Sequence, residues 1–399
     1  MSEALRPGRW RHLRIIVAVL AGLPLLAACS AQGAAVSETT DPQPAIVDLG
    51  GVPAPANTAP LWQKTFDAPV QISLAPDGSV ATALAPGGLR ALGPDGSVLW
   101  RAGTGGVAIA LQGGLVVRGP APTDNGGQLR LYDSAGNLIW QQPGVGPITA
   151  VASPDGNRVA IADDGAGQVW LVDSNPADAP ADAASLPIAG PAALHFTGSD
   201  QLVMDDGTQV SVVAPSGAVK PLCPGGCSGP SRSIAAASNA SWLAVATRGG
   251  DNTLYMFKRD GTALWHRSLP SGGQNRLAVG PKDRRVLLYD LGTAGGLAEV
   301  STSTGLERWA VNLQAGGAAV PAVAATFLPS GGVLVLAQNA SACYVVALDA
   351  FGNPLAALPL PAGATVDLTG TRDAALVATD NTTGSASVDW YSLKVAGGS

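Results

Sequence analysis

The chain has 399 residues, with 51 glycines, 31 prolines, a hydrophobic share of 46%, a charged share of 13% and a formal net charge of −6. The apolar content excludes a wholly disordered chain, and glycine without a three-residue period excludes collagen. The acidic balance speaks against nucleic acid as a partner, because no basic surplus is present to neutralise phosphates. Many turn residues among many apolar ones favour an all-β protein built from short strands.

Residues 1–28 have the features of an export signal peptide. A basic start is followed by the apolar run 15–28, which is too short to span a bilayer as a helix. The run leads into Leu26-Ala27-Ala28-Cys29, which resembles the lipobox of bacterial lipoproteins. The resemblance implies that Cys29 is lipidated and anchors the mature chain to a membrane of the cell envelope. We expect the periplasmic face of an outer membrane if the host has one, and otherwise the outer face of the cell membrane.

Residues 29–59 follow the signal peptide and contain many Ala, Pro and Thr residues without apolar periodicity. This composition predicts a flexible tether between the lipidated cysteine and the folded part of the chain. The folded part is expected over residues 60–395.

Turn residues repeat along this folded part. One series of turns has glycines 40 to 47 residues apart, apart from one double interval: Gly96, Gly136, Gly217, Gly261, Gly305 and Gly352. A second series of turn residues lies between these glycines, and short apolar runs separate the turns. A period of about 40–45 residues is typical of a β-propeller blade. The count predicts eight blades, with the strand-like segment 60–66 completing the last blade and so closing the ring.

The repeat has a recognisable form. Four copies carry a tryptophan four residues after the turn glycine, as in Pro94-Asp95-Gly96-Ser97-Val98-Leu99-Trp100. This pattern resembles the tryptophan-docking repeat of quinoprotein-like (PQQ-like) β-propellers. Eight such blades behind a lipobox are similar to the propeller lipoproteins of the Bam outer-membrane-protein assembly complex. The resemblance implies a monomeric scaffold without cofactor or catalysis that binds a protein partner in the envelope. The alternative is an envelope propeller that binds a quinone or another small ligand, as a PQQ-dependent dehydrogenase or a sensor does.

The tryptophans of the repeat fit both functions. Their fixed place after a turn favours packing between blades, with the indole N–H bonded to a neighbouring backbone, over stacking on a quinone or sugar. Quinone-dependent catalysis also calls for an adjacent cysteine pair and a compact acidic cluster, and the sequence shows neither. We therefore expect a structural role for Trp62, Trp100, Trp140, Trp265 and Trp309.

Two acidic pairs lie in equivalent turns of successive blades. Asp163-Asp164-Gly165 and Asp205-Asp206-Gly207 are 42 residues apart. Asp-Gly is ordinary hairpin chemistry, while two neighbouring carboxylate pairs are also candidate ligands for a hard cation. The Asp-x-Asp-x-Asp-Gly spacing of a calcium loop is missing, which favours the turn interpretation.

Cysteines and histidines supply the remaining candidates. Cys223 and Cys227 flank a Pro-Gly-Gly turn, which in an exported protein favours a short disulfide over free or redox-active thiols. Cys343 lies in an apolar strand and is expected to be a buried thiol. His195, in a strand-like segment, is either a base facing the ring centre or a structural residue.

Overall fold

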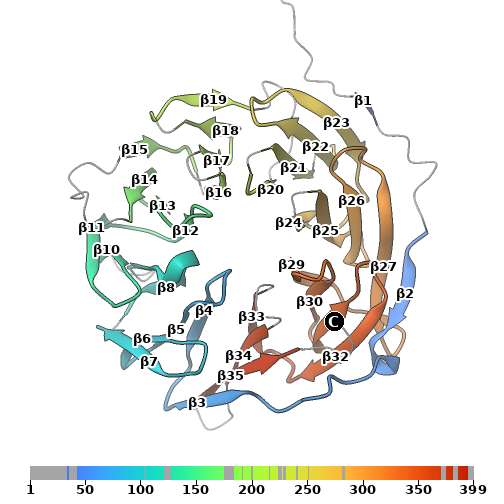
Figure 1. Ribbon diagram of the computed structural model, residues 1–399, viewed down its shortest axis with the longest axis horizontal. Helices are drawn as coiled ribbons and strands as arrows, with labels where there is room; N and C mark the ends of the chain where they lie inside the picture. Colours follow the sequence, from blue (N-terminus) through green and yellow to red (C-terminus); the bar gives the residue numbers. More distant parts are fainter. Residues whose placement is uncertain are drawn as a thin grey trace, which may run out of the picture. The chain divides into compact units, whose positions relative to one another are not determined.

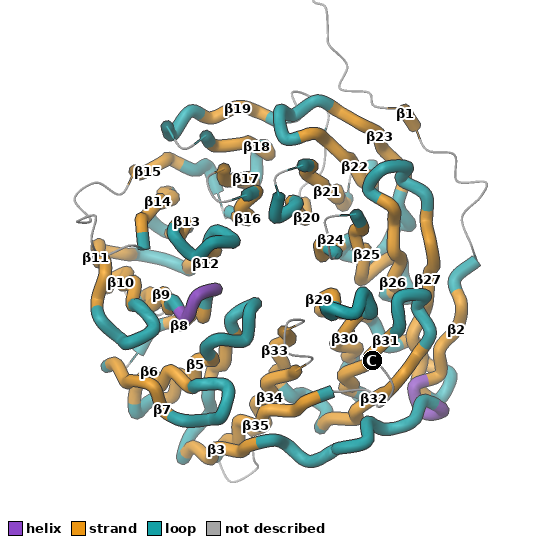
Figure 2. Tube along the Cα trace, in the orientation of Figure 1, coloured by secondary structure: helices purple, strands orange, loops and turns teal. Residues whose placement is uncertain are grey.

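The computed structural model is all-β, with eight small sheets arranged around a ring (Figure 1). It describes residues 34–35, 43–103, 105–120, 127–174, 184–190, 192–198, 201–214, 216–222, 227, 231–239, 241–249, 251–280, 284–369, 374–380 and 385–393. Within these residues the helical turns are two short 3-10 segments, η2 (Leu49–Gly51) and η3 (Gln112–Gly114) (Figure 2). No helix in this part of the chain is long and apolar enough to cross a membrane. The predicted signal peptide and Cys29 lie outside the described residues.

The first four blades are four-stranded antiparallel sheets whose strands follow one another in chain order. Blade one holds β4 (Gln71–Leu74), β5 (Ala81–Ala85), β6 (Gly88–Leu92) and β7 (Val98–Ala102). Blade two holds β8 (Val107–Ala110), β9 (Val116–Gly119), β10 (Gly127–Tyr132) and β11 (Leu138–Gly144). Blade three holds β12 (Ile148–Ala152), β13 (Arg158–Asp163), β14 (Gln168–Asp173) and β15 (Ala184–Pro187). Blade four holds β16 (Ala193–Thr197), β17 (Gln201–Asp205), β18 (Val210–Val213) and β19 (Val219–Pro221).

The next three blades repeat this plan. Blade five holds β20 (Ser231–Ala236), β21 (Trp242–Arg248), β22 (Thr253–Lys258) and β23 (Ala263–Ser268). Blade six holds β24 (Arg276–Val279), β25 (Arg285–Leu291), β26 (Gly296–Ser301) and β27 (Glu307–Ala315), with the short β28 (Ala318–Ala319) paired to β27. Blade seven holds β29 (Ala322–Phe327), β30 (Val333–Gln338), β31 (Cys343–Leu348) and β32 (Pro354–Leu360).

The eighth blade closes the ring in the predicted way. It combines β33 (Thr365–Thr369), β34 (Ala374–Asp380) and β35 (Ala386–Ser392) with β3 (Trp62–Phe66) from the beginning of the folded chain. β3 pairs antiparallel with β35, and Trp62 lies opposite Trp390. The prediction of an eight-bladed propeller closed by an N-terminal strand is therefore confirmed. The closure removes the two open sheet edges that a linear array of blades would leave.

The described part of the segment before β3 differs from the predicted flexible tether over 29–59, while residues 29–33 and 36–42 lie outside the described residues. The strand β1 (Ala34–Ala35) pairs in parallel with β23, and β2 (Ala45–Asp48) pairs in parallel with β27. Farther along, the carbonyl of Pro53 accepts a hydrogen bond of 2.9 Å from the backbone N–H of Ala357 in β32. The segment thus adds to the outer edges of blades five, six and seven (Figure 1). Its low apolar periodicity reflects a strand that is exposed on one side.

We call the outer edges of β23, β27 and β32 the closed rim, because the N-terminal segment covers them. The outer edges of β7, β11, β15 and β19 form the open rim, to which no further strand is added among the described residues. Single apolar side chains lie exposed on the open rim, with 46%, 48% and 46% of their surface accessible in Leu99, Leu138 and Val219.

The hydrophobic core lies between neighbouring blades. The middle strands are buried on both faces and so are apolar throughout, as in β21, where Trp242 to Thr247 are all buried. The outer strands alternate between half-buried and exposed residues, as β7 does. One such core joins Leu287 and Trp309 of blade six to Val335 and Val346 of blade seven. Side chains of both blades fill each interface, which fixes the blades relative to each other.

The two faces of the ring carry different connections. Because successive strands are antiparallel, the first and third hairpins of a blade lie on one face, and the second hairpin lies on the other with the link to the next blade. We call the face with the first and third hairpins the turn face. It carries Gly78 between β4 and β5 and Gly96 between β6 and β7. The opposite link face carries Asp164 between β13 and β14. The turns of both series found in the sequence therefore lie on the turn face.

Candidate functional site

Each repeat tryptophan lies where its own blade meets the next one, at five of the eight blade junctions. The Nε1 of Trp62, at the closing strand, donates a hydrogen bond of 3.0 Å to the carbonyl of Pro94 in blade one. A Cβ added at Gly96 would lie 2.8 Å from the Trp62 ring, so the ring packs directly on the turn glycine. The Nε1 of Trp265 in blade five donates in the same way to the carbonyl of Thr302 in blade six, at 2.9 Å. These indoles are occupied by packing between blades.

The other repeat tryptophans pack with less regular hydrogen bonding. Trp100 and Trp309 lie over Gly136 and Gly352, where an added Cβ would be 2.6 Å and 2.8 Å from the rings. Their Nε1 atoms are buried without a hydrogen-bond partner in the described structure, so the predicted indole hydrogen bond is absent at these two positions. Trp140 is 4% exposed and lies with its ring centre 6.0 Å from that of Trp170 in blade three.

The first acidic pair fastens the link face around blade three. The carboxylate of Asp163 is fully buried and accepts hydrogen bonds from the backbone N–H groups of Val145, Gly146 and Ala166 at 2.9 to 3.0 Å. The neighbouring Asp164 accepts from the N–H of Ala192 at 3.1 Å, ahead of blade four. Burial raises the pKa of Asp164, although the hydrogen bond acts against the shift. Both carboxylates are engaged by the chain itself.

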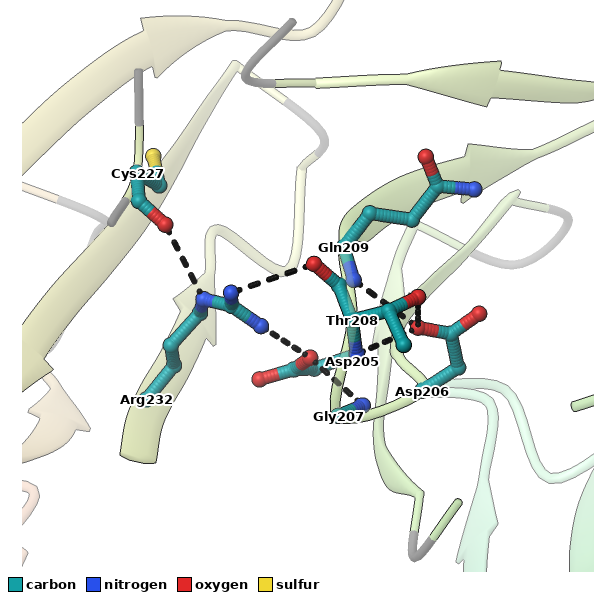
Figure 3. A network of polar contacts seen from close by, with 7 residues as sticks. All are labelled: Asp205, Asp206, Gly207, Thr208, Gln209, Cys227 and Arg232. Atoms are coloured by element: carbon teal, nitrogen blue, oxygen red, sulfur yellow. Dashed lines mark hydrogen bonds and ion pairs between the residues drawn. The ribbon is translucent and has the colours of Figure 1, made fainter. Parts of the chain in front are cut away.

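The second pair lies in the hairpin between β17 and β18 (Figure 3). Asp206 accepts from the N–H and the hydroxyl of Thr208 at 2.8 and 2.7 Å and from the N–H of Gln209 at 2.9 Å. Burial acts to raise the pKa of Asp206, but these hydrogen bonds outweigh it and the pKa is lowered. Asp205 accepts from the N–H of Gly207 at 3.0 Å. Asp206 therefore stabilises the turn.

Asp205 also forms a buried ion pair between two blades. Its Oδ1 lies 2.8 Å from Nη1 of Arg232 in β20, and the two side chains are 8% and 7% exposed. The other guanidinium nitrogens donate to the carbonyls of Thr208 and Cys227, each at 3.2 Å (Figure 3). Burial raises the pKa of Asp205, while Arg232 acts in the opposite direction. One positive and one negative charge balance here, and the donors of Arg232 face chain atoms.

The four aspartates therefore do not form a cation site in this structure. Their carboxylates face backbone and side-chain donors of their own turns and of the neighbouring links. No group of three or more His, Cys, Asp or Glu residues is placed to hold a metal ion in the described ranges. The turn interpretation accounts for the contacts of Asp206, whereas Asp163, Asp164 and Asp205 also bind neighbouring links or the next blade.

Cys227, Cys343 and His195 lie in different blades or links and do not form one site. Cys227 is 8% exposed, and its predicted disulfide partner Cys223 lies outside the described residues, so this pairing stays a prediction. Cys343 is 1% exposed in β31, and burial raises the pKa of its thiol to about 11. Burial lowers the pKa of His195 in β16. A thiol with so high a pKa is nearly all protonated at neutral pH and is a poor nucleophile.

Two cavities were not predicted from the sequence. The larger, of about 700 Å³, lies between blades five and six beside Pro44, and contains the Arg267–Glu307 ion pair of 3.5 Å. The second, of about 610 Å³, lies on the turn face between blades six and seven and is lined by Arg284, Arg285 and Arg308. The doublet at 284–285 was visible in the sequence, but only the fold places the third arginine beside it.

Comparison with known proteins defines the fold and no more. No protein-family model matches the sequence, and no curated protein sequence matches it. Among solved structures, BamB from Moraxella catarrhalis is similar with a TM-score of 0.54 and 15% identity, over 83% of this chain and 99% of that one. Sqt1 from Chaetomium thermophilum has a TM-score of 0.58 and 16% identity, over 85% and 100%.

A third structure shows how widely this fold is used. The dihydro-heme d1 dehydrogenase NirN, in complex with DHE, has a TM-score of 0.55 and 15% identity, over 73% of this chain and 66% of that one. At such identities the likeness shows a shared β-propeller fold alone, since one fold carries many functions. The chain is thus a propeller similar to BamB at the level of the fold.

Proposed function

We propose that this protein is a lipid-anchored scaffold of the cell envelope that binds a protein partner without catalysing a reaction. Lipidation of Cys29 would place the ring at a membrane surface after removal of residues 1–28. The folded part supplies a rigid ring in which docked tryptophans and the Asp205–Arg232 ion pair hold blades together. Where the host has an outer membrane, the likeness to BamB favours a role in outer-membrane protein assembly.

The observation that carries this proposal is the difference between the closed and open rims. The chain itself shows that outer strands of this propeller accept an added strand, because β1 and β2 pair in parallel with β23 and β27. The outer strands of blades one to four present the same kind of edge without such cover. Backbone groups at a free edge pair readily with an extended segment of another protein. The partner we propose is an extended peptide segment that adds to this open rim.

Site-specific photo-cross-linking in native membranes tests the proposal. A photoreactive residue is placed at Leu99 or Leu138 on the open rim, and at Ile46 on β2 as a matched control that is 68% exposed on the closed rim. We expect a discrete protein adduct from the two open-rim positions and much less from Ile46. Absence of any protein adduct would contradict a scaffold function. A barrel-assembly protein in the adduct would support the role in outer-membrane assembly, and its absence would remove that role.

Two further measurements test the remaining parts. The intact mass of membrane-extracted protein should correspond to a chain that begins at an acylated Cys29, and an unmodified N-terminus would exclude the anchor. Titration with pyrroloquinoline quinone and Ca²⁺ should leave the absorption spectrum and the melting temperature unchanged. A stoichiometric spectral change would instead favour the quinone-binding alternative.

A further inference from the structure

The second cavity combines basic and hydroxyl groups from three turns of two blades. Arg285 is the first residue of β25 and Arg284 directly precedes it, while Arg308 comes from β27 and Ser330 from the turn between β29 and β30. The turn before β27 adds further hydroxyl side chains to the lining, namely those of Ser301, Thr302 and Ser303. At about 610 Å³, the space holds more than a single small ion. All these groups are hydrogen-bond donors, which suits a ligand rich in acceptor oxygens.

The described side chains around this cavity carry more positive than negative charge. Glu299 in β26 has an exposed fraction of 0% and pairs with Nη1 of Arg285 at 3.2 Å and with Nη1 of Arg308. Burial raises the pKa of Glu299, although the two arginines act in the opposite direction. Among the described residues, no carboxylate belongs to the lining itself, and Glu299 lies behind the two arginines. Even with Glu299 ionised, the three guanidinium groups leave a surplus of two positive charges among the side chains that the structure describes here.

The shape of the neighbouring turn keeps one arginine in place. Gly331 has a φ of +89°, and a Cβ there would lie 2.5 Å from Nη2 of Arg285. The carbonyl of Gly331 also accepts a hydrogen bond of 3.2 Å from Nη1 of Arg285. A side chain at position 331 would displace the guanidinium, so the glycine is required both for the backbone and for the room it leaves. The donor is therefore already oriented before any ligand arrives.

The same turn has different chemistry in other blades. Blades one and three carry Pro-Asp-Gly at residues 76–78 and 154–156, whereas blade seven carries Pro329-Ser330-Gly331. In blade one the carboxylate of Asp77 accepts a hydrogen bond of 2.8 Å from the N–H of Gly113 in blade two. A carboxylate at position 330 would lie at the cavity and neutralise part of its charge. Serine at this position leaves the surplus uncompensated.

We propose that this cavity binds the phosphate group of a phosphate monoester, either a soluble molecule or a lipid headgroup. A phosphate monoester carries a charge close to −2 at neutral pH, which matches the surplus of two, while a carboxylate would supply only one charge. One guanidinium group can donate two parallel hydrogen bonds to two phosphate oxygens, and hydroxyl groups can donate to the remaining oxygen. The volume beyond the phosphate accommodates the group to which it is esterified. The inference is independent of the scaffold function proposed above.

Calorimetric titration of the purified protein with glycerol phosphate tests the soluble source. Ser330→Asp introduces the carboxylate that the turns of blades one and three already tolerate, and Arg284→Gln removes an exposed guanidinium. We expect saturable binding that each variant weakens by about tenfold or more, because one charged hydrogen bond is lost or opposed. Arg101→Gln, an exposed arginine of β7 in blade one, is the matched control and should leave binding unchanged.

Vesicle flotation tests the lipid source. The protein is mixed with phosphatidylcholine vesicles with or without phosphatidic acid, whose headgroup is a phosphate monoester. Stronger binding to vesicles with phosphatidic acid than to phosphatidylcholine alone assigns the ligand to a lipid, provided that Ser330→Asp and Arg284→Gln abolish the difference. Saturable binding of glycerol phosphate alone assigns it to a soluble molecule. Failure of both probes, or binding that neither variant changes, would overturn the proposal.

Discussion

The closed and open rims are built from the same kind of outer strand, but the chain treats them differently. Blades five to seven have their edges covered by the segment that leads into β3, whereas no described segment covers blades one to four. Blades of both halves pack through buried apolar side chains. The cover is therefore not a requirement for packing one blade on the next, and the open rim is the part to which we assign the proposed partner.

The largest loss of stability is expected from breaking the ion pair between blade four, on the open rim, and blade five, on the closed rim. Arg232→Ala leaves Asp205 buried without its counter-charge, which costs about 3–5 kcal/mol of the free energy of unfolding. Urea unfolding measures the loss. Arg158→Ala is the control, because its ion pair with Asp173 is 33% and 60% exposed, and it should cost less than about 1 kcal/mol. Equal losses would contradict the buried pair.

The pH dependence of that loss has a definite sign. Removing the guanidinium raises the pKa of Asp205 in the folded state further above its unfolded value. Protonated Asp205 is then favoured by folding, so its contribution to stability is present at pH below about 4 and is lost as the pH rises. The difference between the protein and the Arg232→Ala variant should therefore be smaller at pH 4 than at pH 8.

The closed rim itself can be tested by two neighbouring residues of β2. Val47 is 6% exposed and packs in the core between blades six and seven, while Ile46 is 68% exposed. Val47→Asp should lower the free energy of unfolding by about 3 kcal/mol, since it buries a charge in place of an apolar side chain. Ile46→Asp should change it by less than about 0.5 kcal/mol. Similar small effects of both would show that the N-terminal segment does not hold the rim.

A smaller loss of stability is expected where Trp62 of β3, in blade eight, packs on Gly96 of blade one. Gly96 and Gly217 have φ values of +77° and +81°, but an added Cβ meets the Trp62 ring at Gly96 and nothing within 4 Å at Gly217. Gly217→Ala should cost about 1 kcal/mol from the backbone alone. Gly96→Ala should cost about 1–2 kcal/mol more, because it also displaces the indole. Equal costs in thermal unfolding would refute the docking of Trp62.

The smallest loss of stability is expected from two turn aspartates, and it should be equal on the open-rim and closed-rim sides of the ring. Asp133 in blade two and Asp349 in blade seven each accept two backbone N–H groups and one asparagine amide at 2.8–2.9 Å. Replacement of either by alanine should cost about 1 kcal/mol. At Asp349, burial acts to raise the pKa but hydrogen bonds from Asn353 and Phe351 outweigh it, so the pKa is lowered.

The sign of the pH effect follows from this lowered pKa. The stabilisation by Asp349 is present above about pH 4 and is lost as the pH falls through the folded-state pKa. Denaturation at pH 7 and pH 2.5 measures it. A cost that persists undiminished at the lower pH would contradict the role of the ionised carboxylate.

Much of the fold could be predicted from the sequence repeat. Turn glycines at a fixed period and a tryptophan in 60–66 were enough to predict eight blades and their closure, because each reflects a local backbone or packing requirement. The cover of the closed rim was not predictable, since residues 45–53 have no periodicity and pair through their backbone. The arginine cavity was missed for a related reason. Arg285 and Arg308 are 23 positions apart, and only the sheet brings them onto the same Glu299.

Hydrogen exchange of the isolated protein, followed by mass spectrometry, tests the difference between the rims most directly. Strand β2 pairs with β27 and the amide of Ala357 in β32 donates to Pro53, whereas no described strand pairs with the outer side of the open rim. We predict that peptides covering 43–53 and 354–360 exchange at least about ten times more slowly than a peptide covering β19, whose three residues are all exposed. Exchange of 43–53 at the rate of an unstructured chain would contradict the account.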